Sequence, residues 1–207
     1  MKHIFALTIL LMAAVCIYGQ QPASQSPQCS VKLAQSPAVR GIRLGMRLDD
    51  VLATFPGSRE NEFIKNAISN VGFYSGIQTP ARFGVVNFGV LPSEYATKNQ
   101  FAGIESFYFT FVDERLVNYQ VQYPQPPWPK IDEFIEKIAG AFNLPPADKW
   151  TTENFARKNL ACDGFTIQAY TQDGRANLIL KTGDDPFAIQ RERRAAAEAQ
   201  ARREFRP

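Results

Sequence analysis

Histidine is almost absent from this 207-residue chain, which contains only His3. We expect His3 to be removed with an amino-terminal signal, so the mature chain has no histidine for a Ser-His-Asp or Cys-His site. Two mature cysteines are too few for a four-thiolate zinc site, and no Gly-x-x-x-x-Gly-Lys-Ser/Thr phosphate-binding loop occurs. No apolar run approaches the roughly 18 residues of a membrane-spanning helix. These absences predict no catalytic site of the common designs, no cofactor, no metal site and no transmembrane span.

The amino terminus has the pattern of a secretory signal. A basic start, an apolar run over residues 4–15 and small residues near Gly19 predict a signal peptide over residues 1–19. The mature chain is then exported, to the periplasm or the extracellular space. Cys16 leaves open a lipoprotein, because lipid is attached at a cysteine that follows a small residue, but the bulky Val15 before it disfavours this alternative.

Export would place Cys29 and Cys162 in an oxidising compartment, where they can form a disulfide. Residues 20–38, which include Cys29, are rich in Gln, Ser and Pro and lack hydrophobic periodicity, a composition that predicts a flexible leader. A disulfide would tie this leader to the folded body. The alternative, a reactive thiol, is weaker because no histidine remains to activate it.

Two successive stretches have the same order of predicted elements. Apolar residues at helical spacing open each stretch, namely Leu48, Val51, Leu52 and Phe55, then Ile131, Phe134, Ile135, Ile138 and Phe142. A short helix is expected around residues 60–69. Three strands follow each opening helix, over residues 82–91, 104–112 and 116–123, then 154–161, 165–170 and 175–182. Tight turns are predicted at Asp163-Gly164 and Asp173-Gly174, and a short hairpin connection at Asp113-Glu114-Arg115.

These patterns predict an α+β fold of two tandem αβββ units, residues 39–124 and 125–183. The sheet is antiparallel, with helices packed on one face. Phe107, Phe109 and Phe111 alternate along one strand, so their side chains share that face. A basic helical tail is expected over residues 184–207.

Residues 45–57 carry a family resemblance. Their sequence, Gly-Met-Arg-Leu-Asp-Asp-Val-Leu-Ala-Thr-Phe-Pro-Gly, resembles the Gly-Met-x-x-x-(acid)-Val segment, closed by Pro-Gly, that opens repeats of the β-lactamase-inhibitor-protein-like and SmpA/OmlA-like envelope families. The resemblance implies a helix paired with an antiparallel sheet, and a noncatalytic binding or assembly role in the cell envelope. Arg47 stands where those families often have Ser or Thr, which weakens the expected N-cap. No functional residue is carried over, because the motif does not define the binding surfaces.

Four pairs of neighbouring acids keep an enzymatic alternative open, because two carboxylates suffice for glycoside hydrolysis. The pairs are Asp49-Asp50, Asp113-Glu114, Asp132-Glu133 and Asp184-Asp185. Each also has a structural interpretation, as acids in a first helical turn, in a hairpin turn or at a helix N-cap. The favoured function is therefore a secreted or periplasmic noncatalytic binding or scaffold protein of the cell envelope. The alternative is a carboxylate-dependent hydrolase acting on a cell-wall or extracellular polymer.

Two surface features are candidates for contact with a protein or another envelope component. The proline-rich corner over residues 123–129 presents Tyr123 and Trp128 either as a rigid platform for a partner or as a cap on the core. The tail has six Arg against three Glu over residues 191–206. Its composition favours a solvated helix that projects from the domain, and weak contact with an anionic surface is the alternative. Without Lys2 the chain has 22 basic and 20 acidic residues, and this formal charge of +2 predicts no nucleic-acid partner.

Overall fold

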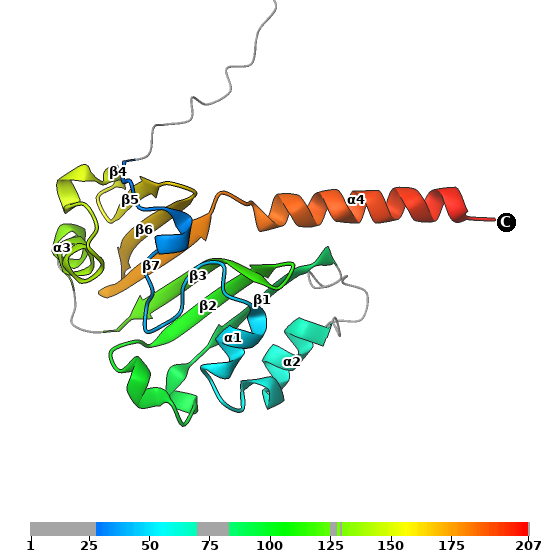
Figure 1. Cartoon of the computed structure of the whole chain (residues 1–207), viewed down its shortest axis with the longest axis horizontal. Helices are drawn as coiled ribbons and strands as arrows, with labels where there is room; N and C mark the ends of the chain where they lie inside the picture. Colours follow the sequence, from blue (N-terminus) through cyan, green and yellow to red (C-terminus); the bar gives the residue numbers. More distant parts are fainter. Residues whose placement is uncertain (1–27, 70–82, 125–127, 129, 207) are drawn as a thin grey trace, which may run out of the picture.

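The computed structural model describes residues 28–69, 83–124, 128 and 130–206 of the chain (Figure 1). Its centre is one seven-stranded antiparallel sheet with the strand order β1-β2-β3-β7-β6-β5-β4. The strands are β1 Val85–Val90, β2 Ser106–Val112, β3 Arg115–Tyr123, β4 Thr151–Asn154, β5 Arg157–Cys162, β6 Phe165–Gln172 and β7 Arg175–Thr182. The predicted signal peptide, residues 1–19, lies outside the described residues.

Four α-helices accompany the sheet: α1 Leu48–Ala53, α2 Glu62–Ser69, α3 Ile131–Phe142 and α4 Pro186–Glu204. Short 3-10 turns complete the structure, at Leu33–Gln35, Ser58–Glu60, Pro92–Glu94, Lys98–Phe101 and Ala147–Lys149. The first three helices pack into one core on one face of the sheet, and α4 points away from the body (Figure 1). The predicted α+β class with a C-terminal helix is confirmed. No described helix has both the length and the apolar character needed to cross a membrane.

The core lies between the sheet and helices α1 to α3. Phe107, Phe109 and Phe111 are at most 1% exposed, so the predicted shared face is the core face. Phe55 packs at the centre of these aromatic rings, with the Phe101 ring centroid only 4.8 Å away. Burial of such large apolar side chains is the main stabilising contribution to a fold of this size.

Both halves of the chain contribute to the same sheet. Strand β3 of the first half pairs with β7 of the second, for example at Gln120 opposite Ile179. The second half has four strands. The strand predicted over residues 154–161 corresponds to β5, but its predicted start is wrong, because β4 precedes it and the two form a hairpin. Its turn begins at Asn154, whose Oδ1 accepts a hydrogen bond from Ala156 N at 2.9 Å. The two halves therefore differ in strand number, and their description as two tandem αβββ units remains a prediction.

The predicted disulfide between Cys29 and Cys162 is confirmed, with a Cα–Cα distance of 4.6 Å. The backbone of residues 28–32 lies along the part of β5 that β4 does not cover. Cys29 N donates to Ala161 O at 3.0 Å, and Asp163 N donates to Val31 O at 3.0 Å. Residues 28–38, which the composition predicts as part of a flexible leader, are thus fixed by backbone pairing and by one covalent bond.

Candidate functional site

The acid pairs predicted from the sequence all have structural partners. Asp132 pairs with Lys158 Nζ at 2.6 Å, and Asp113 accepts two hydrogen bonds from the Arg193 guanidinium, at 2.7 and 2.8 Å. Asp185 caps α4 by accepting a hydrogen bond from Phe187 N at 3.0 Å. Among the described residues, no group of three or more His, Cys, Asp or Glu side chains could hold a metal ion. These acids act as caps and ion-pair partners in the fold.

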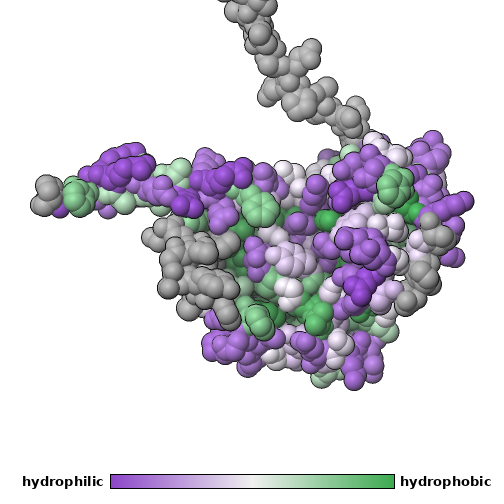
Figure 2. Space-filling view, turned by 180° about the vertical axis from the view of Figure 1, so that it is seen from behind, coloured by the Kyte–Doolittle hydropathy of each residue, from purple (hydrophilic) through white to green (hydrophobic). Residues whose placement is uncertain are grey.

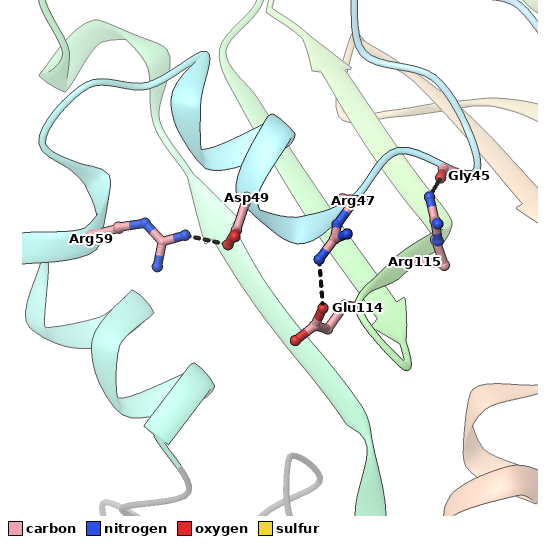
Figure 3. A network of polar contacts seen from close by, with 6 residues as sticks. All are labelled: Gly45, Arg47, Asp49, Arg59, Glu114 and Arg115. Atoms are coloured by element: carbon pink, nitrogen blue, oxygen red, sulfur yellow. Dashed lines mark hydrogen bonds and ion pairs between the residues drawn. The ribbon is translucent and has the colours of Figure 1, made fainter.

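Two further predicted acids pair with arginines in and beside the segment of the family resemblance (Figure 3). Glu114 joins this segment to the β2–β3 turn, and Asp49 joins α1 to the 3-10 turn Ser58–Glu60. Arg47 pairs with Glu114 at 3.3 Å, and Asp49 pairs with Arg59. Arg47 is the N-cap residue of α1 and makes no side-chain cap bond, as its substitution for Ser or Thr predicts. Instead, Leu48 N donates to Glu114 O of the β2–β3 turn at 2.9 Å. The hairpin turn thus replaces the missing side-chain cap of α1.

The face of the sheet opposite the core helices is polar, and we call it the open face. Its side chains alternate in register with the buried ones. Most are polar and uncharged: Asn87, Ser106, Tyr108, Thr110, Asn118, Gln120, Gln122, Asn159, Thr166, Gln168, Tyr170 and Asn177. Charged residues on this face include Arg157, Arg175 and Lys181, and Ile179 is apolar. Tyr108 is 49% exposed. Seen from behind, the molecule has strongly hydrophilic, pale and apolar residues intermixed on its surface (Figure 2).

Hydrogen bonds between strands, one of them reaching across β7 from β3 to β6, fix side chains of the open face. Gln120 Nε2 donates to Tyr170 Oη at 2.9 Å and to Asn177 Oδ1 at 3.0 Å. Tyr108 Oη donates to Asn87 Oδ1 at 3.2 Å. Such bonds set the rotamers before any partner arrives, so less side-chain entropy is lost on binding.

A groove of about 690 Å³ extends the open face at the β1 edge of the sheet. Its lining includes Gly89, Leu91, Tyr108 and Gln122. Leu91 is 45% exposed, and a glycine at position 89 leaves room beside the Tyr108 ring. The groove therefore combines exposed apolar atoms with hydrogen-bonding groups, a combination typical of the centre of a protein interface.

The predicted contact residues, Tyr123 at the end of β3 and Trp128 in the loop that follows, both pack against Phe134 of α3. The ring centroid of each is 5.6 Å from that of Phe134, and both side chains are partly buried against the core. This placement agrees with the alternative in which the corner caps the core, and contact with a partner remains a prediction. Both residues also line a pocket of about 460 Å³ whose rim includes Arg40 and Lys137.

Among the described residues, helix α4 is joined to the body near its base. Ile189 packs against a small apolar group of Val85, Val112 and Val117 on the open face. Arg193 binds the Asp113 carboxylate and donates to Phe83 O at 2.9 Å. The hydrogen bond from Arg193 lowers the pKa of Asp113, so the pair is ionised at neutral pH. No residue of α4 is buried, and the helix is rich in hydrophilic residues (Figure 2).

We expect Gly84→Ala to release the base of α4. Gly84 has φ +75°, and an added Cβ would overlap both Arg193 Nη1 and Asp113 Oδ1. Gly57→Ala is the matched control, because Gly57 has φ +90° and open space at the Cβ position. Both substitutions place an alanine in left-handed backbone, and this backbone strain lowers the free energy of unfolding by about 1 to 3 kcal/mol in either variant. Only Gly84→Ala should accelerate amide hydrogen exchange in α4, and equal exchange in both variants would contradict the anchoring role.

Sequence reasoning identified neither the open face nor the groove. The signal was present in the strand alternation, since Ser106, Tyr108 and Thr110 alternate with three phenylalanines. Sequence reasoning also missed the pairing of Arg40 and Lys137, because these residues are 97 positions apart and only the fold brings them to one pocket.

No protein-family model matches this chain, and the searches of curated proteins and of solved structures likewise find no match.

Proposed function

We propose that the mature chain is an exported, noncatalytic binding or scaffold protein of the cell envelope. The observation that carries the proposal is the open face, a surface of hydrogen-bonding side chains bordered by an apolar groove. The disulfide supports an oxidising compartment, where such bonds persist. The structural roles of the paired acids give the hydrolase alternative no supporting site among the described residues.

The composition of the open face favours a protein partner. Tyrosine and asparagine supply broad contact area and adaptable hydrogen bonds, whereas charged residues are depleted at the centres of interfaces. Around Tyr108 the nearest neighbours across the strands are Gly89 and Gln120, neither of them charged. The partner we propose is therefore a folded envelope protein that places an apolar side chain in the groove and surrounds it with hydrogen-bonding groups.

Site-specific photocrosslinking in the native host tests this proposal. A benzophenone amino acid at position 108 should yield one discrete adduct in intact envelopes. The matched probe replaces Phe155, which is 95% exposed at the turn between β4 and β5, at the opposite edge of the sheet. The position-155 probe should give no such adduct.

A second substitution distinguishes docking from chance labelling. Gly89→Arg places a long charged side chain beside Tyr108, and its new Cβ meets no atom closer than 3.7 Å. This change should abolish the adduct formed by the probe at position 108 while leaving the fold intact by circular dichroism. Equal labelling from positions 108 and 155, or an adduct that survives Gly89→Arg, would rule out docking on the open face.

The tail supports a secondary contact within the same proposal. Its excess of arginine favours weak attraction to an anionic surface, and its apolar side chains beyond Ile189 are mainly alanines, too small for deep insertion. Such an attraction weakens as salt is added.

A further inference from the structure

The pocket beside Tyr123 and Trp128 lies on the core side of the sheet, away from the open face. We propose that it binds a small amphiphile with an apolar chain and an anionic head, of the medium-chain fatty acid class. This inference is independent of docking on the open face, because the two surfaces share no lining residue.

The interior of the pocket suits an apolar chain. Its walls come from the end of β3, from α3 and from three loop segments, and they include the rings of Tyr123, Trp128, Phe134 and Phe142. The volume of about 460 Å³ is in the range of small-molecule sites. Rings held by the core form a preformed site, so a bound chain would gain burial without first ordering the protein.

The charges at the rim select the head group. Arg40 and Lys137 are the only charged residues in the described lining, and both are basic. No described carboxylate lies within 4.0 Å of either cation, and the residues outside the described part contain no Asp or Glu. Glu133 lies one helical turn before Lys137, outside the lining. An anionic head therefore finds two cations without an internal competitor at the rim.

Arg40 is held in position by the backbone. It follows Val39 in a tight turn, where Val39 N donates to Ile42 O at 2.9 Å, and its φ of +54° is unusual for a residue with a side chain. Its Nη2 donates to Ala102 O at 3.1 Å, which fixes the guanidinium at the rim. A side chain retained in left-handed backbone is strained, and such strain clusters at ligand sites.

Tyr123 and Arg40 both line the pocket. Burial raises the pKa of Tyr123 to about 12, and the positive charge of Arg40 opposes that rise. The same positive charge would favour the ionised form of a carboxylic acid bound in the pocket.

Fluorescence quenching of the oxidised mature protein by 12-bromododecanoate tests the inference. The bromine atom quenches an indole only at short range, and Trp128 lines the pocket whereas Trp150 does not. We expect saturable quenching that Trp128→Phe removes. Unbrominated dodecanoate should compete, while dodecanol and dodecyltrimethylammonium should compete at least about tenfold less well. All ligands are used below their micelle concentrations.

Matched variants separate the head-group site from the chain site. Arg40→Asn tolerates the left-handed turn, and together with Lys137→Gln it should weaken dodecanoate binding about tenfold while leaving dodecanol unchanged. Lys130→Gln removes one charge outside the lining and should have no effect. Ala141→Trp, at an exposed lining position of α3, should fill the pocket and abolish binding of every ligand.

Each contrary result has a defined meaning. Equal competition by the three head groups would overturn the anionic selectivity, and quenching that persists in Ala141→Trp would place the ligand elsewhere. Absence of saturable quenching in the wild-type protein would overturn the inference as a whole. None of these results bears on crosslinking at position 108, so failure of this proposal and failure of the proposed function are distinguishable.

Discussion

Replacing Cys162 by serine is expected to lower the free energy of unfolding by about 3 to 5 kcal/mol. The disulfide joins residues 133 positions apart, and the chain-entropy relation gives about 5 kcal/mol for a loop of that length. The variant also frees residues 28–32 to leave the edge of β5, where their backbone hydrogen bonds depend on the tether. Urea denaturation followed by circular dichroism measures the difference.

The control for this experiment is the wild-type protein after reduction and alkylation. Its unfolding midpoint should match that of Cys162→Ser, and Cys29→Ser should match both, because each treatment removes the same bond. Loss of less than about 1 kcal/mol in all three would mean that residues 28–32 contribute little to the stability of the body, contrary to their placement along β5.

Replacing Phe55 by alanine is expected to lower the free energy of unfolding by about 3 to 5 kcal/mol. Phe55 is fully buried, and its ring contacts those of Tyr95, Phe101 and Phe107, at centroid distances of 5.6, 4.8 and 5.9 Å. Truncation removes one ring from this cluster and leaves a cavity that the surrounding backbone of α1 and β2 cannot fill. Denaturant unfolding again gives the measurement.

Phe155→Ala is the matched control, because it is the same chemical change at a side chain that is 95% exposed. Its effect should stay within about 0.5 kcal/mol. If the two variants lost similar stability, the cluster around Phe55 would not form the centre of the core. A destabilised Phe55→Ala that still unfolds in one cooperative transition would show that both halves of the sheet depend on the same core.

Local signals in the sequence were sufficient for much of the fold. The alternation of Phe107, Phe109 and Phe111 identified the core face, and the spacing of Ile131, Phe134, Ile135 and Ile138 identified α3. Turns with Asp-Gly or Asp-Glu were recognised because their residues favour left-handed backbone. The β4–β5 turn was missed because Asn154 makes it through a side-chain hydrogen bond, without a glycine.

Local signals could not predict which strands from distant parts of the chain pair with each other. Nothing local to β3 or β7 indicates that Gln120 lies opposite Ile179, so the sequence left open whether the halves share a sheet. The candidate sites depend on the same kind of information. The open face requires knowledge of which strands are neighbours, and the pocket requires the 38–40 turn and α3 to meet. The disulfide was predictable because Cys29 and Cys162 are the only cysteines outside the predicted signal peptide.

The position of residues 28–32 on the sheet sets an order of events during synthesis. These residues emerge from the ribosome long before β5, yet β5 provides the edge on which they are placed. Cys29 therefore has no native partner until Cys162 has been made. The first described residues to leave the ribosome cannot reach their native position before β5 has been made. An oxidant that acted too early would find Cys29 without its native partner.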